Sequence, residues 1–281
     1  MNVRIIADSS SDIFKLEDME FRSAPLTIST DERSYVDDEN IELDDMLEYL
    51  AHYEGRSFTA CPSIEAWLNA YEGADELYVV TITSALSGTY NSAYVAAGMY
   101  LEKHPDARIH VFDSLSTGPE IRLIVDKLAE LVIAGKTFED ICAEVSNYQK
   151  HLRLFVALES FKNLVNNGRV SKTVARFAGI LGIRIMATAS LEGTIEMQAK
   201  CRGEKGILRK YLECMQEAGY EGGKVYISHC KNQSLADRLK DSILSLFPKA
   251  QVLVYETKGL CSYYAEKGGI ILGCECKKAY V

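Results

Sequence analysis

The amino-acid sequence predicts an α/β protein of two domains, the first built on a mostly parallel sheet flanked by helices and the second on a mixed sheet. Three observations predict this class. Short apolar runs alternate with helical patterns in the first half, and a hairpin-like alternation interrupts the second half. The 281 residues, 47% hydrophobic and 25% charged, suffice for one large globular domain or two of ordinary size.

The first half of the chain consists of strand and helix units. Short apolar runs predict strands at residues 3–7, 76–82 and 107–112. Apolar residues at three- and four-residue spacing predict helices at 42–54 and 62–73, and helices are also predicted near 89–103 and at 121–135. The run 59–62 is interpreted as a turn into the helix at 62–73. Such repeated units imply a parallel sheet with helices on its faces.

The second half has a different character. Strands are predicted at 152–158, 224–230 and 251–256, and helices within 159–172 and at 234–247. Residues 186–200 alternate around Leu-Glu-Gly, which is typical of an antiparallel hairpin. We therefore predict domains at 1–150 and 151–281. No Gly/Pro/Ser-rich linker separates them, so they are expected to pack closely.

The charge and hydropathy of the chain exclude some classes of function. The net charge is −9 and no basic run occurs, which argues against nucleic acid as a partner. No apolar stretch approaches the roughly 20 residues that span a bilayer, and the first residues lack a signal-peptide pattern. We expect a cytoplasmic protein with no integral membrane association.

Hydroxyl side chains gather where the three strands of the first half end. The loops read DSSSD at 8–12, TSALSG at 83–88 and DSLSTG at 113–118. In a parallel sheet these loops share one edge, where helix N-termini favour a carboxylate or phosphate. The ligand-binding candidates are Thr59, Ser84, Ser87, Gly88, Thr89 and Ser114. A single serine here is more often an N-cap, but three such loops favour a shared site.

Gly88 and Arg169 each allow two interpretations. Gly88 either permits close approach of the backbone to a ligand or an unusual dihedral, or it belongs to a plain helix-entry turn. Arg169 lies between the Gly168 turn and Ser171, a predicted helix start. Its guanidinium is either an exposed charge between two caps or a group at the ligand's entrance or a partner surface.

The sequence offers no catalytic or metal-binding pattern. It has no GxSxG elbow, no phosphate-binding P-loop and no GxGxxG after a strand. The five histidines lie outside the three loops, so no general base is evident and we predict no catalytic residues. The eight cysteines form no CxxC pair, and the CxC of Cys274 and Cys276 in a strand only places both side chains on one face. We expect reduced, mostly buried thiols and no metal site.

The order and spacing of these motifs resemble the DegV family over almost the whole chain. The matching segments are RIIADSSSD (4–12), TACPS (59–63), TSALSGTYNSA (83–93), DSLSTG (113–118), FKNLVNNGRVSK (161–172), LGIRIMATASLEGTI (181–195) and KCRGEKG (200–206). The resemblance implies an apolar tunnel between two α/β domains that holds one fatty acid, with no other cofactor. It implies that hydroxyls at the turn of Thr59 and the loop of Ser84 and Ser87 hold the carboxylate. Some members are the acyl-binding subunit of a bacterial fatty acid kinase and present the carboxylate to a separate ATP-binding subunit.

Two departures from the family pattern affect these implications. The TSQPS turn of the family is TACPS here, with Ala60 and Cys61 in place of the two polar residues. The family's THxGPG-like loop corresponds to 259–273, where Ala265 falls at the histidine position. The loss of that histidine removes a carboxylate contact, and it weakens the expectation of a kinase partner more than that of lipid binding.

Three hypotheses follow for the function. The leading one is a fatty-acid-binding protein that is not itself an enzyme. The second is an enzyme acting on a phosphorylated or carboxylated small molecule at the same loops. The third is a lipid-sensing protein with a partner other than a kinase. Co-purified lipid would support the first, and turnover of phosphate esters the second.

Overall fold

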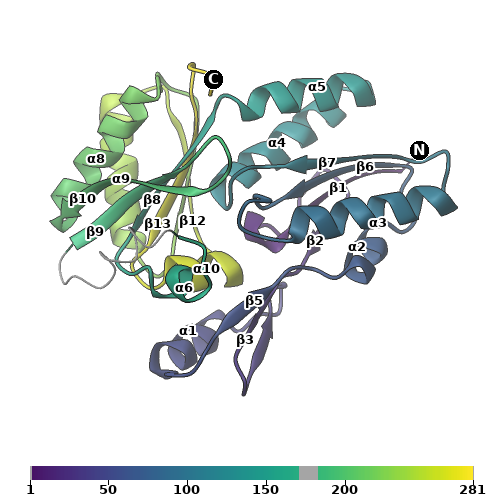
Figure 1. Cartoon of the computed structure of the whole chain (residues 1–281). Coiled ribbons are helices and arrows are strands. Elements are labelled where there is room, and N and C mark those ends of the chain that lie inside the picture. Colours follow the sequence, from purple (N-terminus) through teal and green to yellow (C-terminus); the bar gives the residue numbers. More distant parts are fainter. Residues whose placement is uncertain (1, 171–182, 281) are drawn as a thin grey trace.

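A four-stranded parallel sheet organises the first half of the chain in the computed structural model, which describes residues 2–170 and 183–280 (Figure 1). In sheet order its strands are β2 (Phe21–Ala24), β1 (Val3–Asp8), β6 (Glu76–Thr81) and β7 (Arg108–Asp113). Every neighbouring pair is parallel, so the prediction of a parallel sheet is confirmed. The loops after β1, β6 and β7 therefore meet at one edge of the sheet.

Helices cover both faces of this sheet. One face carries α2 (Ile64–Tyr71) and α3 (Thr89–Lys103), and the other carries α4 (Pro119–Ile133) and α5 (Phe138–Gln149). Alternate residues of β6 serve the two layers: Leu77 and Val79 pack on the first pair of helices, Tyr78 and Val80 on the second. Burial on both faces explains why the strand reads as a continuous apolar run.

A six-stranded mixed sheet organises the second half. Its order is β10 (Ile195–Arg202), β9 (Ile183–Ala189), β8 (Leu152–Leu158), β13 (Ile270–Glu275), β11 (Lys224–His229) and β12 (Gln251–Glu256). Only β11 and β12 pair in parallel, and the predicted antiparallel hairpin is the β9–β10 pair. The last strand, β13, lies in the middle of the sheet between β8 and β11, which the sequence did not predict.

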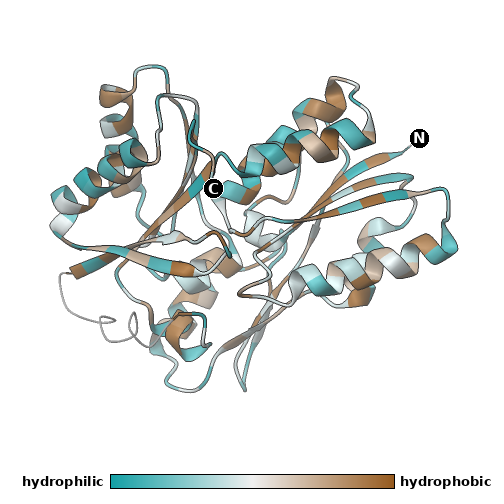
Figure 2. Ribbon diagram, turned by 45° about the horizontal axis from the view of Figure 1, so that its top comes forward, coloured by the Kyte–Doolittle hydropathy of each residue, from teal (hydrophilic) through white to brown (hydrophobic). Residues whose placement is uncertain are grey.

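The outer face of the mixed sheet is covered by α8 (Gly203–Glu217) and α9 (Gln233–Leu246). The inner face meets α4, α6 (Lys162–Asn166) and α10 (Gly259–Ala265). Helix α4 thus packs between the two large sheets, contacting β1 and β6 on one side and β8, β11 and β13 on the other. Figure 2 shows hydrophobic residues along the strands and along the helix sides that face them.

A third, small antiparallel sheet joins β4 (Ser34–Val36), β3 (Thr27–Ser29) and β5 (Phe58–Ala60), beside α1 (Leu43–His52). The predicted turn at 59–62 is wrong at its start, because Thr59 lies in β5 opposite Ile28. The turn begins after Ala60, and the Ser63 hydroxyl caps α2 by accepting the Ala66 N–H at 3.1 Å. A three-residue strand followed by Cys and Pro carries too little pattern to be predicted.

The remaining global expectations concern membranes, metals and thiols. No helix in the described ranges combines the length and the apolar character needed to cross a bilayer. Within residues 2–170 and 183–280, no three His, Cys, Asp or Glu side chains gather as a metal site requires. All eight cysteines are free thiols, and six of them are buried.

Candidate functional site

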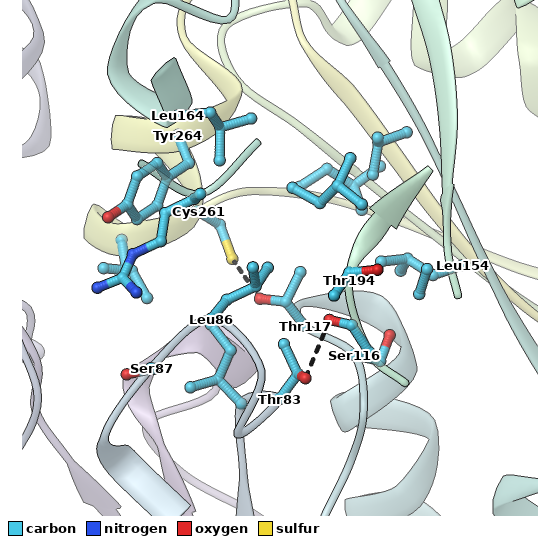
Figure 3. Close-up of a pocket in the computed structure, with 18 of the residues that line it drawn as sticks. Thr83, Leu86, Ser87, Ser116, Thr117, Leu154, Leu164, Thr194, Cys261 and Tyr264 are labelled. Atoms are coloured by element: carbon cyan, nitrogen blue, oxygen red, sulfur yellow. Dashed lines mark hydrogen bonds between the residues drawn. The ribbon is translucent and has the colours of Figure 1, made fainter. Parts of the chain in front are cut away.

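A mostly apolar cavity lies between the loops that follow β6 and β7 and the inner face of the mixed sheet (Figure 3). The space between its walls, the mouth included, is about 870 Å³. Its aliphatic lining residues are Leu26, Ile82, Leu86, Leu115, Leu154, Val156, Leu158, Leu164, Ala189, Ile195, Leu260, Ala265 and Ile271. Such a wall favours a flexible hydrocarbon over a polar metabolite.

Strand β8 shows how the local sequence builds this wall. Leu154, Val156 and Leu158 alternate along the strand and all face the cavity. Phe155 and Ala157, between them, face the opposite core under α8 and α9. The uninterrupted apolar run at 152–158 therefore serves one hydrophobic core and one ligand cavity.

The charge inside the cavity is positive. Among the described lining residues, Arg169 alone carries a full charge, and none is an aspartate, a glutamate or a histidine. Arg169 is half-buried and follows α6. The turn in front of it is held by Asn167, whose side-chain amide donates to the Tyr263 hydroxyl at 2.9 Å. An anionic ligand would meet one cation and no competing carboxylate in this lining.

Several hydroxyls of the lining already donate hydrogen bonds to other groups of the protein. The Thr83 hydroxyl donates to the Gly193 carbonyl at 3.0 Å. The Ser116 hydroxyl donates to Glu120 at 2.8 Å, and the Thr188 hydroxyl donates to the Leu154 carbonyl at 2.7 Å. These oxygens can still accept hydrogen bonds, but they cannot donate to a carboxylate without breaking a bond.

Three other hydroxyl pairs keep a proton available. Ser87 Oγ lies 2.8 Å from Thr89 Oγ1, Thr59 Oγ1 lies 2.8 Å from Tyr264 Oη, and Thr194 Oγ1 lies 2.9 Å from Ser190 Oγ. Each pair has two protons and uses one between its members, so one O–H per pair remains for a ligand. Ser87, Thr59 and Tyr264 all line the cavity, and Figure 3 shows Ser87 and Tyr264 on the side away from Leu154 and Thr194. Two of the three pairs therefore offer their spare protons at the end of Ser87 and Tyr264, and the third offers one at Thr194.

The predicted site residues separate into those that line the cavity and those that do not. Thr59, Ser87 and Arg169 line it, and Thr89 is buried behind Ser87. The Ser84 side chain is exposed and outside the lining, while its backbone N–H donates to Asp113 at 3.1 Å. Ser114 is buried and donates to the Ser116 carbonyl at 3.0 Å.

Gly88 has an ordinary backbone conformation, with φ of −75° and ψ of 1°. The interpretation that it needs an unusual dihedral is therefore wrong. A side-chain carbon built at this position would lie 3.5 Å from Cys61 Sγ, which is an ordinary contact. The predicted helix start at Ser171 lies outside the described residues.

Helix α10 supplies four cavity residues, of which the sequence indicated only Ala265. Leu260, Cys261, Tyr264 and Ala265 all line the cavity from this seven-residue helix. The run GLCSYYA is too short for a clear helical period, so no local signal singles out Tyr264 as a site residue. Ala265, matched above to a histidine of the family pattern, is 2% exposed and does line the cavity.

Buried aspartates behind the cavity fasten its walls through backbone hydrogen bonds. Asp8 accepts the Ile82 N–H at 2.6 Å, and Asp12 accepts the Lys258 N–H at 2.7 Å. Asp37 accepts the N–H groups of Gly259 and Leu260 at 2.7 and 2.8 Å, at the start of α10. Burial raises the pKa of Asp8 and Asp37 to about 6, and that of Asp12 to about 8.

Replacing Asp12 with asparagine should stabilise the protein at high pH. The folded pKa of Asp12 is raised from 3.8 to about 8, so stability present below about pH 4 is lost as the pH rises through about 8. Asparagine keeps an acceptor for the Lys258 N–H and removes the buried charge. In urea unfolding, the stability advantage of D12N over the unsubstituted protein should grow between about pH 5 and pH 9.

D18N is the matched control, because it removes one carboxylate charge from an exposed position and not from a buried one. D18N should follow the pH dependence of the unsubstituted protein. If D12N also runs parallel to it, the carboxyl of Asp12 does not titrate with a raised pKa.

The chain is similar to known proteins in sequence and in fold. A family model described as "Uncharacterised protein, DegV family" matches residues 2–273. A "DegV domain-containing protein" of Streptococcus gordonii is 40% identical over 279 residues, which are 98% of this chain and 99% of the relative.

Two solved structures superpose closely on this chain. A DegV family protein from Eubacterium eligens loaded with heptadecanoic acid has a TM-score of 0.96 and 49% identity, over 98% of this chain and 100% of its own. The Streptococcus pneumoniae Fatty Acid Kinase (Fak) B3 protein loaded with linoleic acid has a TM-score of 0.96 and 40% identity, over 99% of this chain and 100% of its own.

Proposed function

This chain belongs to the DegV family, and from that premise we propose that it is a cytoplasmic protein that binds one long-chain fatty acid in the cavity. The ligand lies between the two domains that we propose at residues 1–150 and 151–281. The protein performs no chemistry on it. The observation that carries this proposal is an aliphatic wall that holds one cation, Arg169, among its described residues, with two of its three spare hydroxyl protons at the end of Ser87 and Tyr264.

The carboxylate is assigned to the end where Ser87, Thr59 and Tyr264 offer two of the spare protons. Ser87 donates one hydrogen bond, the Thr59–Tyr264 pair donates another, and Arg169 supplies the positive charge. Thr89 orients Ser87 from behind. Ala265, at the position of the family's histidine, cannot donate a hydrogen bond, but the neighbouring Tyr264 belongs to the donor set.

The hydrocarbon tail supplies most of the affinity. A C16 chain has about 14 methylenes, and each contributes about 0.8 kcal/mol when it is buried, so the gross gain is about 11 kcal/mol. Charge-assisted hydrogen bonds add roughly 1.5–3 kcal/mol each. The tail therefore dominates binding, while the polar end fixes which way the lipid lies.

The first experiment is mass spectrometry of an organic extract from the purified, folded protein. We expect a fatty acid in near-stoichiometric amount. An empty extract together with turnover of phosphate esters would instead favour an enzyme acting at the same loops.

Replacing Ser87 with alanine should weaken the binding of a fatty acid but leave that of the fatty alcohol of equal chain length unchanged. The loss for the acid should be roughly 10- to 150-fold, because one charge-assisted hydrogen bond contributes about 1.5–3 kcal/mol. The alcohol carries the same tail without the negative charge. Competition with a fluorescent lipid measures both affinities in one assay.

Ser84, three residues earlier, gives the matched control, since its side chain is exposed and outside the cavity lining. S84A should bind acid and alcohol as the unsubstituted protein does. Equal losses for acid and alcohol in S87A would mean that Ser87 contacts the tail, and no loss for either would remove it from the site.

We further propose that the bound carboxylate is presented to a separate ATP-dependent fatty acid kinase subunit. The name of the Streptococcus pneumoniae relative supports this role, and the alanine at position 265 speaks against it. The test combines the loaded protein, ATP and the ATP-binding subunit of a bacterial fatty acid kinase. Trapping the product with hydroxylamine detects an acyl phosphate, and loaded protein that yields none would leave lipid sensing with another partner.

A further inference from the structure

Cys274 and Cys276 bring two thiols together on the face of the mixed sheet that lies away from the cavity. Their sulfur atoms are 3.7 Å apart, close to van der Waals contact. Both side chains belong to the hydrophobic core under α8 and α9, with 0% and 6% of their surface exposed. Cys274 lies in β13, and Cys276 follows directly after its end.

The surroundings of the pair favour a thiolate on Cys276. Cys274 lies opposite Arg153 in the antiparallel pair of β13 and β8, so the two side chains share a face. Arg153 is 6% exposed, and its guanidinium lies 3.7 Å from the ring centre of Tyr280. The hydrogen bond from the Cys274 thiol, helped by the charge of Arg153, lowers the pKa of Cys276, while the pKa of Cys274 rises.

The backbone geometry permits a disulfide between these residues but does not make it relaxed. Successive strand residues rise by about 3.2–3.4 Å, so residues two apart are separated by about 6.4–6.8 Å between Cα atoms. That is the upper end of the range of about 4.4–6.8 Å seen in disulfides. A bond formed under such strain is readily reduced again, as in regulatory rather than structural disulfides.

We propose that Cys274 and Cys276 form a reversible redox site that a hydroperoxide converts to an intrastrand disulfide. This inference is independent of lipid binding. It rests on the contact between the two sulfurs, the adjacent arginine and the single residue that separates the cysteines.

The chemistry needs only the hydroperoxide as the oxidant. The Cys276 thiolate attacks one peroxide oxygen and the O–O bond breaks, which leaves a sulfenic acid on Cys276 and, after proton uptake, one water. The Cys274 sulfur then attacks the sulfenic sulfur. The S–S bond forms, and the hydroxyl leaves with the Cys274 proton as a second water. Overall, two thiols and one hydrogen peroxide give one disulfide and two waters.

The test treats the folded full chain with hydrogen peroxide, then denatures it, alkylates the free thiols and maps the peptides by mass spectrometry. The C61S substitution removes the exposed thiol so that intermolecular disulfides do not form. We expect the peptide with Cys274 and Cys276 to lose two hydrogens and to escape alkylation. Dithiothreitol should restore both thiols.

Cys201 and Cys214 serve as internal controls, because they belong to the same core and burial raises their pKa values. The pair at 274 and 276 should react at least about tenfold faster than either control, since the thiolate is the reactive form. In C274S, the reaction should stop at a sulfenic acid on Cys276 that dimedone traps.

The mapping of the C61S chain decides the proposal even if C274S does not fold. The proposal is wrong if Cys274 and Cys276 remain alkylatable under a peroxide exposure that oxidises Cys61 in the unsubstituted chain. It is also wrong if Cys276 is found bonded to any cysteine other than Cys274, or if the controls react as fast as the pair.

Discussion

Replacing Ala189 with tryptophan is expected to abolish the retention of a long fatty acid. Ala189 lines the cavity at the end of β9. An indole at this position takes the space of about four methylenes, and losing their burial at about 0.8 kcal/mol each costs about 3 kcal/mol, or roughly 200-fold in affinity. Mass spectrometry of the extract and competition with a fluorescent lipid both report the loss.

Two comparisons make this result specific to the cavity. Ala143 is exposed on α5, so A143W adds the same side chain without entering the cavity and should keep the lipid. A fatty acid about four carbons shorter should recover affinity in A189W relative to the long one. If A189W is folded and still carries one equivalent of the long fatty acid, the lipid binds somewhere else.

Replacing Asp37 with alanine is expected to cost the fold about 2–6 kcal/mol. Asp37 is fully buried, and it is the acceptor for the N–H groups of Gly259 and Leu260 at the start of α10. Alanine leaves two buried donors without an acceptor, at about 1–3 kcal/mol each. Denaturant unfolding should show a lower midpoint with an unchanged slope.

Two variants calibrate the size of this effect. The asparagine variant, D37N, keeps one acceptor oxygen and should fall between alanine and the unsubstituted protein. Glu39 is exposed two residues later, and E39A should change stability by less than about 0.5 kcal/mol. A loss in D37A as small as that in E39A would contradict the role of Asp37 in fastening α10.

The parallel half of the fold could be predicted because its strands carry an unambiguous pattern. The apolar run at 76–82 is buried on both faces by separate helix layers, and the structure has a strand at Glu76–Thr81. The helix predicted near 89–103 is Thr89–Lys103, a helix of 15 residues whose buried positions recur at three- and four-residue spacing. Length and period together separate such elements from their alternatives.

The place of β13 could not be predicted in the same way. Its apolar run, IILG, is too short for periodicity to distinguish a strand from a buried helix. Its position between β8 and β11 depends on pairing with residues more than a hundred positions earlier and about forty positions earlier in the chain. Neither partner can be recognised from local propensity.

The meeting of the hydroxyl-rich loops could be predicted, but the role of each hydroxyl could not. The loops do meet beside the cavity, as parallel topology requires, but their side chains separate there. The Ser87 hydroxyl lines the cavity, and the Ser84 side chain is exposed. The Ser114 hydroxyl donates to the Ser116 carbonyl within its own loop. These residues are alike in sequence, and only their hydrogen-bond partners decide which proton is available to a ligand.

The central position of β13 also constrains how the protein is made. Strands β8 and β11 cannot be joined until residues 270–275 have left the ribosome, because β13 lies between them. The parallel sheet, all of whose strands come before residue 114, has its pairing partners much earlier in synthesis. The nascent chain therefore carries unpaired strand edges and an unfinished Leu154–Leu158 wall until late in synthesis, and such exposed edges favour aggregation.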